Sequence, residues 1–220
     1  LSALRSVAAK PKRDRPGGGL LAIFAPGRLR VTFLLGASFF ISLGAVALLA
    51  SWSPTFFNVR MDIPVERYAQ ISLFFYAGSL LGTLFVGPLM DRFRPARTLI
   101  LLSALASGAI ASVGVFPFGA VSSIIAFFLW GFSQTAVQAG LNALCAQAYP
   151  TEIRSTAVGW AFGLGRIGGI VGPGLGGLAI ASALSLQEIF LIAALAPFLV
   201  MLFLLDLMRQ LGSYPPVNRT

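Results

Sequence analysis

The chain has 220 residues, of which 57% are hydrophobic and 10% are charged, and its mean hydropathy is +0.86. Soluble domains carry about 25% charged residues, so this composition excludes an ordinary soluble globule and indicates a protein that lies in lipid. The net charge is +9, but the basic residues lie at the ends of apolar segments, so the charge does not indicate nucleic-acid binding. The chain has no histidine, which excludes zinc sites with histidine ligands and Ser/His or Cys/His catalysis. Cys145 is its one cysteine, so the chain has no disulfide framework.

Residues 1–30 form the first predicted element, a basic and flexible loop rather than a folded domain. They hold seven basic residues, one acid and the run Pro16-Gly17-Gly18-Gly19. A binder of nucleic acid or anionic lipid could use such a segment, but we favour a cytoplasmic loop that its charge holds near the membrane. Six apolar segments follow, and a bilayer-spanning helix needs about 20 such residues. We expect an all-α membrane region over residues 31–208, with helices over 31–57, 68–90, 98–116, 120–149, 155–184 and 187–208, and a tail over 209–220.

The basic residues predict how these helices are oriented. The N-terminal segment, the loops after the second and fourth helices and the tail hold 13 of the 16 lysines and arginines. The other side has Arg60 and Arg67, balanced by Asp62 and Glu66. An even number of spans puts both termini on one side, which the positive-inside rule makes cytoplasmic.

The loop after the second helix, residues 87–97, reads GPLMDRFRPAR. An acid where a helix leaves the membrane, followed by spaced arginines, can bridge the ends of neighbouring helices. Three arginines after a helix are also what simple positive-inside anchoring produces. The residues alone leave both interpretations open.

The fourth helix carries a polar stripe. Gln134, Gln138 and Asn142 recur at i, i+4 and i+8, which places them on one helix face. Amides in lipid need partners, and a water-filled cavity that binds the hydroxyl and carboxylate groups of a small organic acid would supply them. Hydrogen bonds between helices, worth only about 0.6 kcal/mol each, would also do so.

The fifth helix is rich in glycine. Gly163, Gly165 and Gly168 fit the G-x-G-x-x-G dinucleotide fingerprint, but no strand precedes them and no βαβ unit surrounds them. We instead interpret the glycines as small-xxx-small pairs that let helix backbones approach closely in lipid. The packing residues are Gly159, Gly163, Gly165, Gly168, Gly169, Gly172, Pro173 and Gly176. Pro173 should kink or loosen the helix, which suits either motion or static packing.

Arg166 lies about three turns into the fifth helix. A charge at the bilayer centre costs at least about 2.5 kcal/mol, so Arg166 should face a cavity or a partner. It could attract the carboxylate of a substrate, act in structure or gating, or extend its side chain to the interface. No acid lies at the middle of a predicted span, and with no histidine in the chain no titratable group there could carry a proton across the membrane.

Two motifs carry a resemblance to a known family. GPLMDRFRPAR resembles the G-x-L-x-D-R-x-G-R-R loop of the major facilitator superfamily, with Arg94 in place of the usual glycine. GLNALCAQAYPTEIRSTAVGWAFGLGRIGGIVGP is similar to the tenth and eleventh helices of its aromatic acid:proton symporter branch, and Trp52-Ser53-Pro54 fits the end of the seventh. The resemblance covers residues 31–208.

The resemblance implies one half of a twelve-helix transporter, with the other six-helix half upstream of Leu1. It implies secondary transport of a small organic anion, an aromatic acid, by alternating access with proton symport in a bacterial inner membrane, with no enzyme activity, cofactor or metal. The implied cytoplasmic gate consists of Asp91, Arg92, Arg97, Glu152 and Arg154. Sugar and other metabolite carriers share Y-P-x-E-x-R and remain an alternative, as do an integral membrane enzyme and a non-transporting membrane anchor.

Overall fold

The computed structural model describes residues 19–115, 120–182 and 184–211. Within these residues it contains a short 3-10 helix, six long α-helices and no strand. The elements are η1 (Leu20–Phe24), α2 (Leu29–Met61), α3 (Val65–Arg92), α4 (Pro95–Val115), α5 (Ala120–Ala148), α6 (Arg154–Ala181) and α7 (Leu186–Leu211). The predicted all-α fold is confirmed, and each predicted span corresponds to one long helix. Residues 1–18 and 212–220, which belong to the predicted loop and tail, lie outside the described residues.

Five of the long helices are long and apolar enough to cross a membrane, by length and composition. The exception among the described helices is α6, which we also predicted as a span. Its many glycines add no apolar side chain, and Arg166 lies within it. The same glycines that weaken this signal bring α6 against its neighbour.

The six helices pack in a symmetric pattern. The most extensive contacts join α2 to α6, α3 to α5 and α4 to α7, and α4–α5 and α2–α7 contacts follow. If α2, α3 and α4 are exchanged with α5, α6 and α7, the α2–α6 pair becomes α3–α5, the α4–α5 pair becomes α2–α7, and the α4–α7 pair maps onto itself. This is the pattern of two three-helix units with inverted topology, the repeat found within each half of facilitator-type transporters.

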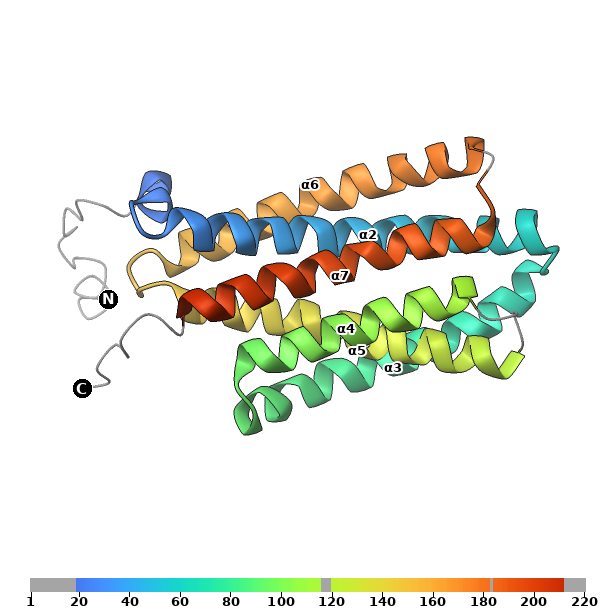
Figure 1. Cartoon of the computed structure of the whole chain (residues 1–220), viewed down its shortest axis with the longest axis horizontal. Helices are drawn as coiled ribbons and strands as arrows, with labels where there is room; N and C mark the ends of the chain where they lie inside the picture. Colours follow the sequence, from blue (N-terminus) through green and yellow to red (C-terminus); the bar gives the residue numbers. More distant parts are fainter. Residues whose placement is uncertain (1–18, 116–119, 183, 212–220) are drawn as a thin grey trace, which may run out of the picture.

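One end of the bundle collects the basic turns. Figure 1 shows that η1, the α3–α4 turn, the α5–α6 turn and the end of α7 all lie at the same end. This end, which we call the basic end, carries Arg28, Arg92, Arg94, Arg154 and Arg209. The α2–α3 turn lies at the opposite end, where Asp62 adopts a left-handed conformation (φ 52°) and ends α2.

The predicted flexible loop over residues 1–30 ends earlier than expected, because Leu20–Phe24 forms η1. Ile23 is completely buried, and its carbonyl accepts a hydrogen bond of 2.6 Å from the Thr32 hydroxyl. The Phe24 ring meets the edge of Trp160 on α6, with ring centroids 5.3 Å apart. The apolar run LLAIF therefore anchors the segment before α2 to the bundle.

Glycines form the seam between α2 and α6. A Cβ atom built at Gly168 would overlap the carbonyl oxygen of Phe40, and one at Gly172 would overlap that of Gly44. Near the other end Gly176 leaves room for the ring of Trp52, whose Nε1 donates a 2.7 Å hydrogen bond to the Pro173 carbonyl. The backbones of α2 and α6 thus touch directly, and α6 continues as a helix through Pro173.

The α3–α5 pair has a matching seam. Gly78 and Gly82 lie against the carbonyl oxygens of Phe128 and Phe132, and Gly131 lies against that of Phe75. Both seams belong to corresponding pairs of the two three-helix units. Other glycines of α6 do not serve the seam, because a Cβ at Gly159, Gly163 or Gly169 would meet no heavy atom within 4 Å.

We predict that Gly172→Leu destabilises the bundle, while Gly163→Leu on the same helix does not. A side chain at position 172 would overlap the backbone of α2, and overpacking of this kind costs about 1–3 kcal/mol or more. Thermal unfolding of the two variants in detergent measures the difference. Equal melting temperatures would show that the α2–α6 seam does not stabilise the fold.

Candidate functional site

A polar cluster joins α2 and α5 inside the bundle. The amide Nε2 of Gln134 donates to the hydroxyl of Ser42 at 2.9 Å, and that hydroxyl donates to Oε1 of Gln138 at 3.0 Å. Ser42 and Gln134 are 3% and 4% exposed, so both bonds are shielded from solvent within the described bundle. The first two members of the predicted stripe therefore contact a neighbouring helix.

Two amide atoms of the stripe have unused hydrogen-bonding capacity. Nε2 of Gln138 and Oδ1 of Asn142 are buried, and neither has a hydrogen-bond partner among the described residues. They are a donor and an acceptor one helical turn apart on the same face of α5. Buried polar atoms are normally satisfied, so this pair is a candidate for binding a ligand or water.

A small cavity lies beside the cluster. It is lined by residues of α2, α4, α5 and α7, including Ser42, Ser103 and Gln134, and its volume is about 10 Å³. The Ser103 hydroxyl is fully buried without a hydrogen-bond partner among the described residues. Such a volume holds about one water molecule, which could bridge Ser103 to the cluster.

Arg166 lies on the side of α6 that does not face α2. The neighbouring Gly165 and Gly168 contact α2, whereas the Arg166 side chain is exposed and bonds to no other described residue. Phe162, one helical turn earlier, lies at the edge of the α2–α6 contact, where its ring centroid is 5.4 Å from that of Phe39 on α2. The Arg166 side chain is thus exposed on the described bundle, one helical turn from the residue that forms this aromatic pair.

The predicted gate residues all lie at the basic end (Figure 1). Asp91, Arg92 and Arg97 flank the α3–α4 turn, Glu152 lies in the α5–α6 turn and Arg154 begins α6. All five are exposed. Glu152 accepts a 3.2 Å hydrogen bond from Thr151. In the described part of the chain, no ion pair involves Asp91, Arg92, Arg97 or Arg154. The structure brings the two turns to one end but does not join these four charges.

The basic end also contains two interactions that sequence reasoning missed. Arg30 of α2 donates from Nε and one Nη to the carboxylate of Asp206 on α7, at 3.1 and 2.8 Å. The Tyr149 hydroxyl lies 2.8 Å from the Thr32 hydroxyl, and burial raises the pKa of this phenol above its usual value. Both pairs are more than a hundred residues apart in sequence, so no periodicity could reveal them. Asp206 is one of two acids in the apolar last helix, and nothing in the sequence pairs it with Arg30.

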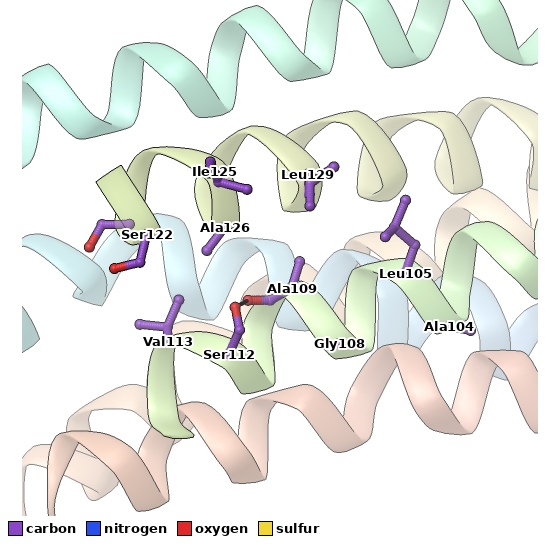
Figure 2. A pocket seen from close by; sticks show the side chains of 11 residues that line it. Ala104, Leu105, Gly108, Ala109, Ser112, Val113, Ser122, Ile125, Ala126 and Leu129 are labelled. Carbon is purple, nitrogen blue, oxygen red and sulfur yellow. Dashed lines mark hydrogen bonds between the residues drawn. The ribbon is translucent and has the colours of Figure 1, made fainter. Parts of the chain in front are cut away.

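A separate groove lies between α4 and α5. Figure 2 shows its lining, which includes Leu105, Gly108, Val113, Ile125 and Leu129, and its volume is about 470 Å³. The lining contains no charged residue, and the hydroxyl of Ser112 donates to the Ala109 carbonyl at 2.7 Å. None of the predicted site residues lines this groove, so it does not compete with the α2–α5 cluster as a site for an anion.

Comparison with known proteins points to one family of membrane transporters. A family model described as Major Facilitator Superfamily matches residues 2–173. The chain is 32% identical to a gallate transporter of Pseudomonas putida over 174 residues, which are 79% of this chain and 38% of that protein. It is 34% identical to a 3-(3-hydroxy-phenyl)propionate transporter of Escherichia coli over 196 residues, 87% of this chain and 46% of that protein.

A third relative is a 4-hydroxybenzoate transporter of Acinetobacter baylyi, 31% identical over 160 residues, which are 72% of this chain and 34% of that protein. The chain therefore spans less than half the length of each of these three relatives.

We predict that Ser42→Ala destabilises the bundle more than Ser38→Ala. Removing the Ser42 hydroxyl breaks the α2–α5 bonds to Gln134 and Gln138, and two such bonds are worth about 1 kcal/mol. The Ser38 hydroxyl is equally buried but bonds only to Leu34 of its own helix, so it is a matched control. Thermal unfolding in detergent compares the variants, and an equal loss would mean that the cluster does not hold α2 to α5.

Proposed function

The chain belongs to the Major Facilitator Superfamily, and we propose that it forms the second six-helix half of a secondary transporter that moves an aromatic acid by alternating access. The family and the matched relatives are transporters and not enzymes. Three relatives carry gallate, 3-(3-hydroxy-phenyl)propionate and 4-hydroxybenzoate in their names, and all three are hydroxylated aromatic acids. The contact pattern of two inverted three-helix units supports the assignment of this chain to one transporter half. A first six-helix half would complete the twelve-helix transporter.

The observation that carries the proposed substrate class is the unused donor and acceptor on α5. Nε2 of Gln138 can donate to a carboxylate or phenolic oxygen, and Oδ1 of Asn142 can accept from a phenolic hydroxyl. The Ser42 hydroxyl donates to Oε1 of Gln138 and itself accepts from Gln134, and this chain of hydrogen bonds holds Gln138 in place. A hydroxybenzoate-type acid offers both kinds of group, so it can satisfy atoms that are buried without partners.

Arg166 is the proposed partner of the substrate carboxylate. Among the described residues it is the one basic residue within a long helix and away from its ends, and its exposed side chain is available to a ligand. A guanidinium binds a carboxylate with two parallel hydrogen bonds, which gives both affinity and orientation. Phe162, one turn away, adds an aromatic surface beside it.

The protein is an integral membrane protein, and we propose that the basic end faces the cytoplasm of a bacterial inner membrane. The charge bias of the loops supports this orientation, with both termini cytoplasmic. Asp91, Arg92, Arg97, Glu152 and Arg154 would then form a cytoplasmic gate, which their exposure at one end supports. Their partners would lie in the first half, which would also hold the residue that carries the symported proton.

We predict that Arg166→Gln raises the KM for labelled 4-hydroxybenzoate uptake about tenfold or more, because a hydrogen bond to a charged group is worth about 1.5–3 kcal/mol. Arg166→Lys should restore part of the affinity, since it keeps the charge but not the bidentate geometry. Arg67→Gln, at the opposite end, serves as the control. An unchanged KM in Arg166→Gln would remove Arg166 from the substrate site.

We further predict that uptake of 4-hydroxybenzoate by the complete transporter depends on a proton gradient. Uptake is measured in cells or vesicles with and without an uncoupler. Equal uptake in both conditions would reject proton symport. Proton-coupled uptake by residues 31–208 alone would contradict a proton carrier in the first half.

A further inference from the structure

A second groove lies at the basic end, between α6 and α7 with α2 as its floor. Its volume is about 880 Å³, and its walls are mainly apolar and aromatic, with Phe33 and Phe40 on α2 and Trp160 and Leu164 on α6. Phe24 of the docked η1 closes one side of it. No residue of the proposed substrate site lines this groove.

The groove and the substrate cluster occupy opposite sides of α2. Phe33 precedes Ser42 by nine residues, which is two and a half helical turns, so the two side chains point in opposite directions. Ser42 contacts α5, whereas Phe33 lies in the groove with 68% of its surface exposed. An occupant of the groove would therefore lie outside the polar cluster.

The mouth of this apolar groove is cationic. Arg30 and Gln210 line it, and Arg28 lies between two further residues of that region, Gly27 and Leu29. Asp206 holds the Arg30 guanidinium through two of its five N–H groups, and the Arg30 side chain remains 68% exposed. The ion pair fixes the direction of the guanidinium and leaves N–H groups that can bind a phosphate.

We propose that this groove binds an anionic phospholipid, with an acyl chain along Phe33, Phe40 and Trp160 and the headgroup phosphate at Arg30 and Arg28. An apolar trough that ends in arginines has the chemistry of such a lipid and not of a soluble anion. The inference rests on the proposed orientation, which places the basic end in the cytoplasmic leaflet. It does not depend on which acid the transporter carries.

Trp160 provides a local probe of the groove. The folded protein, together with its first half where that half is present, is prepared with Trp160 as its sole tryptophan. Trp52→Phe and Trp130→Phe remove the other two tryptophans of this chain, and any tryptophan of the first half is also replaced. The protein is reconstituted in symmetric phosphatidylcholine vesicles of two kinds. One kind contains phosphatidylglycerol with a brominated acyl chain, and the other contains phosphatidylcholine with a brominated acyl chain. We expect brominated phosphatidylglycerol to quench Trp160 with about thirtyfold higher relative affinity, because each of the two arginines near the surface contributes about 1 kcal/mol.

The preference should disappear in the Arg28→Gln, Arg30→Gln double variant and be absent when Trp52, near the other end, is the sole tryptophan. Equal quenching by the two lipids would overturn the proposal, because the groove would then hold bulk lipid. No quenching by either lipid would also overturn it, because the groove would then be covered by protein. A preference that survives in the double variant would exclude these arginines as the headgroup site.

A second measurement keeps the native tryptophans. Native mass spectrometry of the unsubstituted protein should retain phosphatidylglycerol, and its affinity should fall about thirtyfold in the double variant but not in Arg67→Gln. Unchanged retention in the double variant would overturn the proposal. Neither readout uses uptake, so a protein that binds this lipid but carries no aromatic acid would reject the proposed function and leave this inference intact.

Discussion

The direct contact between the backbones of α2 and α6 is the constraint on which the rest of this structure depends. Within lipid, an apolar side chain gains little free energy when it moves from lipid to a helix interface, because both surroundings are apolar. Close packing must therefore hold the helices together. Gly168 and Gly172 provide that packing by leaving no side chain between the helices. The α3–α5 seam repeats the solution with Gly78 and Gly82. The contacts of α4 with α5 and α7, and of α2 with α7, bring the two pairs together, and Ser42 then reaches both Gln134 and Gln138.

The two sides of α2 then serve different environments. One side carries Ser42 and faces α5, where the buried amides remain partly unsatisfied. The opposite side is the floor of an apolar groove that ends at Arg30. Arg30 itself is bound to Asp206 of α7, and the neighbouring Thr32 contacts both η1 and Tyr149. The first turns of α2 therefore connect the segment before the bundle, the α5–α6 turn and the last helix.

The helices could be predicted from the sequence because their signals are local. Long apolar segments between charged turns suffice to place α2 to α7, whereas η1 is five residues long and depends on its contacts with Thr32 and Trp160. The stripe on α5 was recognisable from its spacing, but spacing does not reveal that Ser42 lies opposite it. Small-xxx-small spacing likewise fits two faces of α6, and only the position of α2 separates Gly168 and Gly172 from Gly159 and Gly163. Arg30–Asp206 joins the first and last long helices and had no local signal.

The glycine seams also determine how this sequence can change. At Gly168 and Gly172 the atom that opposes a new side chain is a backbone oxygen, which is present whatever residue the partner helix carries. No second substitution on α2 can make room for it. At Gly36 and Gly140 the opposing atoms belong to the side chains of Leu164 and Leu99, and a smaller residue there could compensate. Compensatory pairs are therefore available at Gly36 and Gly140, whereas the seam glycines have no such route to a larger residue.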